Sequence, residues 1–192
     1  IRKFESDPRR TRSTVGMDGE VSPIRTGTSL QPPRDDSDWK ALLDFLEPVI
    51  RESLWRYVDD VPPFSLLMQQ EPIMYSFPPM IERVEPGQEF KWHYDHAAVC
   101  SNRVLAGLLY LRDIEHGGYT EFGEQQCKVM SAAGKIALFP PYWTHIHRGV
   151  SPTSEIKYVV SWFYLYQGGK EASDGRPRSV HKSSYPAAMP RN

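Results

Sequence analysis

The hydrophobic pattern divides the chain into a short helical part and a long strand-rich part. Large apolar residues recur at intervals of three and four between Trp39 and Tyr57, which is the spacing of one side of a helix. A cluster of Asp and Ser at residues 35–38 precedes this pattern and is typical of a helix start. Pro48 lies inside the pattern and predicts either a kink or two helices that meet there. We expect the apolar stripe to pack on a sheet.

Residues 73–166 show a different pattern, in which short apolar or alternating runs are separated by turn sequences such as Glu85-Pro86-Gly87. The predicted strands are residues 81–84, 88–95, 104–111, 119–122, 126–130, 135–139, 142–147 and 156–166. Eight short strands at this spacing favour a mainly β fold, a double-sheet jelly roll with flanking N-terminal helices packed outside it.

The same pattern predicts how the chain is organised. Residues 1–36 are polar and show no period, so we expect an arm or loops that fold over the domain. Residues 37–166 hold the helices and the jelly roll. Residues 167–192 contain few large apolar groups and predict a mobile tail or a surface strap. With 40% apolar residues in 192, the chain has material for one core.

Charge and cysteine content narrow the classes of partner. The 23 basic residues nearly balance the 24 acidic ones, which gives no reason to expect nucleic acid or an anionic membrane as a partner. No apolar run approaches the roughly 18 residues that a bilayer-spanning helix needs. Two cysteines outside any CxxC pair indicate free thiols, so we expect a cytoplasmic protein. Nothing in the sequence predicts an oligomeric state.

The triplet His93-Tyr94-Asp95 carries the first chemical signal. Alternate residues of a strand share one face, so His93 and Asp95 point together into the barrel while Tyr94 points away. An imidazole and a carboxylate presented in this way supply two neighbouring ligands of an octahedral metal site. The triplet is too short to be specific alone, so a third ligand must come from another strand.

Two histidines compete for that third position. His145 and His147 are two residues apart and share one face of the predicted strand 142–147, so periodicity does not choose between them. His96 faces the side opposite to Asp95, which favours a position behind the ligands or on the surface. His116 lies in a predicted turn and is expected to be solvated.

Four segments together resemble a known family. They are EPGQEFKWHYDH, LLYLRDIEHGGYTEF, GKIALFPPYWTHIHRG and the lysine in EIKYVVSW. The stretch from about Glu82 to Trp162 resembles the double-stranded β-helix core, a cupin-like jelly roll, of the iron(II)- and 2-oxoglutarate-dependent oxygenases. The similarity is greatest to their prolyl 4-hydroxylase-like branch, in which the same motifs follow in the same order at matching intervals.

The resemblance implies roles for individual residues. His93, Asp95 and His147 match the iron ligands, and Lys157, ten positions after His147, matches the basic residue that pairs with the distal carboxylate of 2-oxoglutarate. Tyr110 and Thr120 match positions that contact the same carboxylate. Val84 departs from many relatives, which have Tyr before the EPG turn. Related halogenases replace the metal-binding carboxylate with a small residue, so the intact Asp95 favours hydroxylation.

The resemblance also implies a reaction. We expect Fe(II), 2-oxoglutarate and O2 to be used in hydroxylating a C–H bond, with release of succinate and CO2 and with ascorbate as a stimulant. The expected substrate is a prolyl residue of a peptide or protein. The alternatives are a free amino acid or another small molecule, since this scaffold accepts many substrates. A non-catalytic cupin-like binding module is a further alternative, but its mark would be a missing ligand or lysine, and none is missing here.

Overall fold

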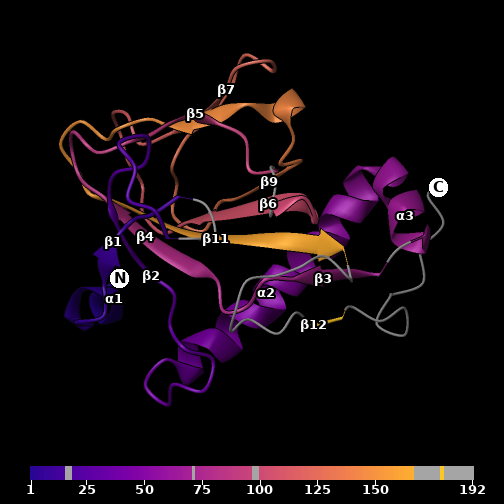
Figure 1. The fold of residues 1–192 in the computed structure, drawn as a ribbon, viewed down its shortest axis with the longest axis horizontal. Coiled ribbons are helices and arrows are strands. Elements are labelled where there is room, and N and C mark those ends of the chain that lie inside the picture. Colours follow the sequence, from indigo (N-terminus) through magenta and orange to yellow (C-terminus); the bar gives the residue numbers. More distant parts are fainter. Residues whose placement is uncertain (16–18, 71, 97–99, 167–177, 180–192) are drawn as a thin grey trace.

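Two β-sheets face one another, and a long helix lies on the outer side of the larger sheet (Figure 1). This arrangement comes from a computed structural model that describes residues 1–15, 19–70, 72–96, 100–166 and 178–179. Most of the predicted tail 167–192 therefore lies outside the described residues. All strand pairings within the described residues are antiparallel, and the predicted mainly β jelly roll is confirmed.

The larger sheet is organised around its longest strand, β11. One edge of β11 pairs with β6, which in turn pairs with β9, and the other edge pairs with β4 and then β3. The strands of this sheet within the described residues are β1 (Thr11–Arg12), β2 (Thr28–Leu30), β3 (Ile73–Tyr75), β4 (Met80–Val84), β6 (Arg103–Tyr110), β9 (Ile136–Phe139), β11 (Lys157–Tyr166) and β12 (Arg178–Ser179).

The smaller sheet has the order β5-β10-β7-β8. Its strands are β5 (Phe90–His93), β7 (Thr120–Phe122), β8 (Cys127–Val129) and β10 (His147–Gly149). In the register of this sheet His147 lies opposite His93 on one neighbouring strand and opposite Phe122 on the other. This register brings together two histidines that are far apart in the sequence.

Alternation along β11 separates the core from the space between the sheets. Tyr158, Val160, Trp162 and Tyr164 belong to the hydrophobic core shared with the helices, whereas Lys157, Val159, Ser161 and Phe163 line a cavity between the two sheets. The Tyr164 hydroxyl donates a 2.5 Å hydrogen bond to the carbonyl of Ile50 in the long helix. One face of β11 thus packs in the hydrophobic core, and the other face lines the cavity between the sheets.

Three helices occur among the described residues: α1 (Arg2–Ser6), α2 (Lys40–Asp60) and α3 (Pro62–Gln70). The predicted apolar stripe packs through buried Leu43, Leu46, Ile50 and Leu54. Burying each such side chain contributes at most about 1.5–3 kcal/mol. The helix continues through Pro48, so the alternative of two helices meeting there is wrong. The next helix, α3, begins at Pro62, in a segment where no helix was predicted.

The predicted strand 142–147 is also wrong. Trp143–His145 form a short 3-10 helix, in which the His145 amide donates to the Tyr142 carbonyl, and β10 begins only at His147. Just before this 3-10 helix, the Pro141 carbonyl accepts hydrogen bonds from the amides of both Asp95 and His96, which ties the segment to the residues that follow β5. The local alternation therefore did not correspond to a strand at this position.

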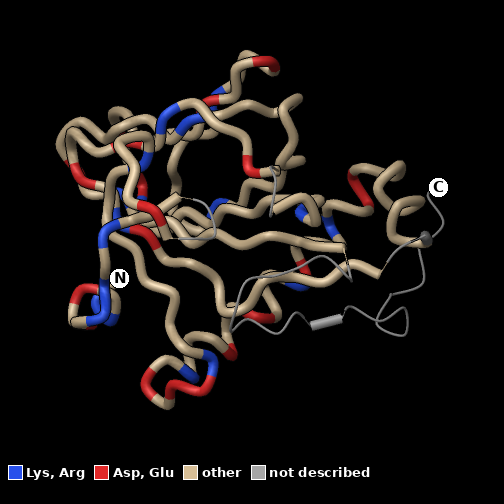
Figure 2. Tube along the Cα trace, viewed as in Figure 1, with Lys and Arg blue, Asp and Glu red and all other residues tan. Residues whose placement is uncertain are grey.

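The described parts of the arm, residues 1–36, add short strands to the barrel. Strands β1 and β2 pair with each other, and β2 pairs with β4 at the edge of the larger sheet. Basic and acidic residues are interspersed along the trace (Figure 2). Among the described residues, no helix combines the length and the apolarity that a membrane crossing requires.

Candidate metal centre

A cavity of about 480 Å³ lies between the two sheets. Strands β4, β6 and β11 form one wall, β5, β7 and β10 form the opposite wall, and residues 14–15 and 24–26 of the N-terminal arm close one side. Its lining is mixed: apolar groups such as Val84, Leu108 and Val159 surround a small number of histidine, carboxylate and cationic side chains. This composition is typical of a small-molecule binding site.

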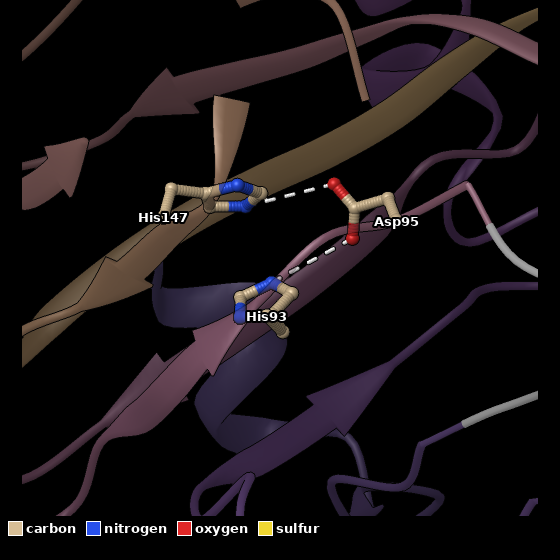
Figure 3. A group of neighbouring side chains, drawn as sticks. All are labelled: His93, Asp95 and His147. Atoms are coloured by element: carbon tan, nitrogen blue, oxygen red, sulfur yellow. Dashed lines mark ion pairs between the residues drawn. The ribbon is translucent and has the colours of Figure 1, made fainter. Parts of the chain in front are cut away.

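Three potential ligands converge in this cavity (Figure 3). His93 ends β5, Asp95 follows it by two residues, and His147 begins β10. The Nε2 atoms of His93 and His147 each lie 3.6 Å from a different oxygen of the Asp95 carboxylate. One donor atom from each residue can be chosen so that all lie within 4.8 Å of one another, which leaves space for one metal ion.

Backbone carbonyls orient both imidazoles. His93 Nδ1 lies 2.7 Å from the Lys91 carbonyl oxygen, and His147 Nδ1 lies 2.9 Å from the His145 carbonyl oxygen. A carbonyl only accepts, so in each ring the proton is on Nδ1 and the lone pair of Nε2 faces Asp95. Burial, followed by the neighbouring His147, lowers the pKa of His93 to about 4. His93 is therefore neutral near pH 7 and able to bind a metal.

A buried cation occupies another part of the same cavity. Lys157 is buried at the start of β11, and burial lowers its pKa to about 8, although nearby Glu82 acts in the opposite direction. Its Nζ lies 5.4 Å from the ring centre of Tyr110, whose hydroxyl donates a 2.7 Å hydrogen bond to Thr120. Lys157 and Thr120 both line the cavity, whereas Tyr110 is fully buried beside it. The structure thus brings these three predicted residues together.

The family model of the 2OG-Fe(II) oxygenase superfamily matches residues 79–165. This part of the chain is a 2OG-Fe(II) oxygenase domain. Among curated protein sequences, none matches the chain significantly.

Solved structures of prolyl hydroxylases share the fold of the oxygenase domain and its flanking elements. One, from Trichoplax adhaerens in complex with a peptide fragment of the hypoxia inducible factor oxygen degradation domain, has a TM-score of 0.68 at 16% identity, covering 85% of this chain and 74% of its own. A prolyl-4-hydroxylase from Pseudomonas putida has a TM-score of 0.58 at 16% identity, with 85% and 81% covered. The viral collagen prolyl hydroxylase of Paramecium bursaria Chlorella virus-1 has 0.56 at 16% identity, with 81% and 94% covered.

The superfamily uses Fe(II) and 2-oxoglutarate, and the cavity of the oxygenase domain suits both. Two neutral imidazoles and one carboxylate are the donor set of a facial iron site that keeps coordination positions open. Lys157 offers a positive charge in the same cavity, which a dicarboxylate can use for its second carboxylate. The predicted ligand set and the predicted anchor therefore occupy one space between the two sheets.

His145, the competing candidate, lies outside the three-residue cluster. It belongs to the 3-10 helix, its Nδ1 lies 3.1 Å from the Thr144 hydroxyl, and its carbonyl is the group that orients His147. His147, two residues later, thus lines the cavity of the oxygenase domain, while the backbone carbonyl of His145 orients the His147 ring.

Sequence reasoning missed several polar residues that line the cavity of the oxygenase domain. Arg25 and Glu82 form a bidentate ion pair at 2.9 and 3.0 Å, and Glu82 is buried. Burial alone would raise the pKa of Glu82, but Arg25, together with Ser13 and Lys157, outweighs burial, so the pKa lies below its ordinary value. Strand alternation with Val84 could have placed Glu82 in the cavity. For Arg25 the sequence held no signal, because its position depends on the path of the arm.

Arg103 is a further residue that the sequence did not reveal. Its guanidinium carbon lies 3.7 Å from the ring centre of Phe163, and its Nη1 donates a 3.2 Å hydrogen bond to the carbonyl of Asp95. Arg103 lines the cavity of the oxygenase domain. A cation is thus placed directly beside a predicted metal ligand.

The two other histidines considered from the sequence, His96 and His116, lie outside the three-residue cluster. His96 contacts the carbonyl of Arg103 through Nδ1 at 3.1 Å, and His116 is exposed as predicted. Trp162 is buried in the core, whereas Trp143 is exposed. The outer face of the smaller sheet carries Arg148, which pairs with Glu121 at 2.6 Å and lies over Trp92.

Proposed function

We propose that the protein hydroxylates a C–H bond of prolyl residues in a peptide or protein, using Fe(II), 2-oxoglutarate and O2. The observation that carries this proposal is the presence of the His93–Asp95–His147 cluster and the buried Lys157 in one cavity. The peptide as substrate is supported by the structural similarity to prolyl hydroxylases, one of which is in complex with a peptide fragment. A free amino acid or other small molecule remains the alternative.

His93, Asp95 and His147 would hold the iron through two Nε2 atoms and one carboxylate oxygen. When bound, the iron and 2-oxoglutarate supply the oxidising chemistry, in which one oxygen atom of O2 enters the substrate and the other enters succinate as CO2 leaves. The Lys91 and His145 carbonyls hold the two imidazoles in place. Because each carbonyl contacts Nδ1, each ring presents its Nε2 toward Asp95 and is oriented before the metal arrives.

Lys157 would bind the distal carboxylate of 2-oxoglutarate. The lysine is buried, so its charge is weakly screened and a carboxylate partner gains more than it would at the surface. Thr120 lines the same cavity, and because its hydroxyl accepts from Tyr110, its own proton is available for a bond to the carboxylate. The apolar residues Val84 and Val159 keep water away from this end.

Arg103 would contact the peptide. Stacking on Phe163 and the bond to the Asp95 carbonyl fix its guanidinium beside the metal cluster. A guanidinium in this position can donate to a backbone carbonyl of a peptide, which places the target residue next to the ligands. We further propose that ascorbate stimulates turnover by keeping the iron reduced.

The test combines the purified protein with Fe(II), 2-oxoglutarate and O2. One set of reactions contains proline-rich peptides, another contains free amino acids, and His93→Ala is the control. We expect succinate release together with a mass gain of one oxygen atom on the peptide. Brisk turnover of a free amino acid without peptide modification would replace the peptide as substrate. Equal succinate from the native protein and His93→Ala would reject the oxygenase activity and leave a binding module.

A further inference from the structure

The N-terminal arm connects the two sheets at the metal end of the cavity. The Lys91 amide donates to the Ile24 carbonyl at 2.7 Å, and the Thr26 amide donates to the Glu89 carbonyl at 2.8 Å, so residues 24–26 continue the smaller sheet beyond β5. A few residues later β2 pairs with β4 of the larger sheet. Arg25 lies at the crossing and points into the cavity.

Three hydrogen bonds hold the Arg25 guanidinium in one orientation. Its Nε and Nη2 donate to the two oxygens of Glu82 at 2.9 and 3.0 Å, and its Nη1 donates to the Thr14 carbonyl at 3.0 Å. The planar guanidinium matches the carboxylate in a bidentate pair, and a buried pair of this kind resists rotation. Arg25 is therefore held both by the arm, through Thr14, and by β4 of the larger sheet, through Glu82.

Arg25 contacts a ring that contacts a predicted metal ligand. Its guanidinium carbon lies 4.9 Å from the ring centre of Phe90, and the Phe90 ring stacks on the His93 imidazole with centres 3.5 Å apart and planes 13° apart. Gly149 of β10 is the strand partner of Phe90. The Phe90 ring thus contacts both the Arg25 guanidinium and the His93 imidazole.

We propose that Arg25 is a positioning residue for His93, acting through Phe90, and that Glu82 anchors Arg25. This inference rests on the proposed role of His93 as a metal ligand. One hydrogen bond from Nδ1 to the Lys91 carbonyl fixes a point of the imidazole but permits rocking about that bond. A parallel ring stacked on its face removes this freedom, and the guanidinium keeps the ring against it.

With Arg25, the residues that support the metal site extend beyond residues 79–165, the segment that matches the family model. Arg25 lies far ahead of that segment in the sequence, yet it belongs to the environment of the first ligand. Residues that orient a metal ligand without binding the metal typically change metal affinity by about 10–100-fold when they are replaced. The arm would then contribute to metal affinity as well as to the wall of the cavity.

The test measures Mn(II) binding by the full chain, by the loss of the free-ion electron paramagnetic resonance signal, with neither 2-oxoglutarate nor peptide present. Arg25→Met keeps the length of the side chain and removes its charge. We expect its Mn(II) dissociation constant to rise about tenfold or more. Arg83→Met is the matched control: Arg83 follows Glu82 on β4, faces the opposite side of that strand and pairs with Glu5 of the N-terminal segment at 3.0 Å. It should bind Mn(II) as the native protein does.

A double variant keeps the test decisive if a single replacement unfolds the chain. Arg25→Met with Glu82→Met removes both buried charges, a change that is often neutral for stability. We expect this variant to keep the native unfolding midpoint and to lose Mn(II) affinity, and Arg25→Lys to recover only part of the affinity because an ammonium cannot form the bidentate pair. Native Mn(II) affinity in the double variant, or equal losses in Arg25→Met and Arg83→Met, would overturn the inference. Mn(II) binding is independent of the organic substrate, so a wrong prolyl assignment would leave this result unchanged.

Discussion

The Tyr110 hydroxyl donates a 2.7 Å hydrogen bond to the Thr120 hydroxyl, and this bond joins the two sheets of the barrel. Tyr110 lies at the end of β6 and Thr120 at the start of β7, and both are buried. Burial raises the pKa of Tyr110 to about 12, so the phenol keeps its proton and remains a donor. Because Lys157 lies over the same ring, the bond supports the position where a carboxylate would bind.

Replacing Tyr110 with Phe should therefore affect stability and 2-oxoglutarate binding together. Loss of the bond leaves a buried Thr120 hydroxyl without its donor, and we expect a loss of about 1–2 kcal/mol in the free energy of unfolding in urea. The affinity for 2-oxoglutarate, measured by calorimetry with Mn(II) bound, should fall. Tyr158→Phe is the control, because that hydroxyl donates to Glu5 away from the cavity. Unchanged 2-oxoglutarate affinity in Tyr110→Phe would contradict the assignment.

Individual histidine variants test the predicted ligand set. His93→Ala and His147→Ala each remove one donor atom from the cluster, and we expect Mn(II) affinity to fall by more than tenfold in both. His145→Ala keeps the backbone carbonyl that orients His147 and should bind Mn(II) nearly as the native protein does. Loss of binding in His145→Ala with retention in His147→Ala would reverse the assignment of the third ligand.

Lys157 predicts a pH dependence of 2-oxoglutarate binding. Burial lowers its pKa to about 8, below the ordinary value of 10.5, so the empty site loses its positive charge as the pH rises through about 8. The dissociation constant for 2-oxoglutarate should increase between pH 7 and 9. Lys157→Met should bind weakly at every pH, whereas Lys157→Arg, which stays charged, should lack the decline. A native affinity that is flat across this range would show that Lys157 is not the anchor.

The free energy of unfolding should follow the same titration with a defined sign. Between about pH 8 and 10.5 the unfolded chain keeps the Lys157 proton that the folded protein has lost. The contribution of Lys157 to the free energy of unfolding therefore rises with pH between about pH 8 and 10.5, because the unfolded chain binds one more proton than the folded protein. Urea unfolding of the native protein and Lys157→Met at pH 7.5 and 9.5 measures the difference; a fall in native stability relative to the variant would contradict it.

Arg103→Gln tests the proposed peptide contact. We expect kcat/KM for a peptide to fall about tenfold or more, the effect of losing one charged hydrogen bond of about 1.5–3 kcal/mol, with 2-oxoglutarate affinity retained. Arg148→Gln serves as the control, since Arg148 pairs with Glu121 on the outer face. If both variants slow peptide turnover equally, Arg103 has no special role.

The class of fold and most of the chemical groups of the site follow from patterns between residues that are close in the sequence. Alternation of residues along short strands predicted the jelly roll, and the two-residue spacing of His93 and Asp95 placed them on one side of the chain. The apolar stripe from Trp39 to Tyr57 predicted α2, because helical spacing is a property of neighbouring residues. The family motifs supplied Lys157, Tyr110 and Thr120, which the structure brings together.

Residue alternation alone could not choose the histidine that lies beside Asp95: the family motifs indicated His147, and strand pairing brings His147 to that position. Local alternation treated His145 and His147 alike, but His145 ends the 3-10 helix while His147 begins β10, and pairing with β5 brings His147 opposite His93. The same limit applies to Arg25 and Glu82, which are far apart in the sequence and meet only because the arm crosses from one sheet to the other. Periodicity encodes the direction of a side chain relative to its neighbours. It does not encode the path that brings distant segments into contact, which depends on strand pairing and packing across the whole barrel.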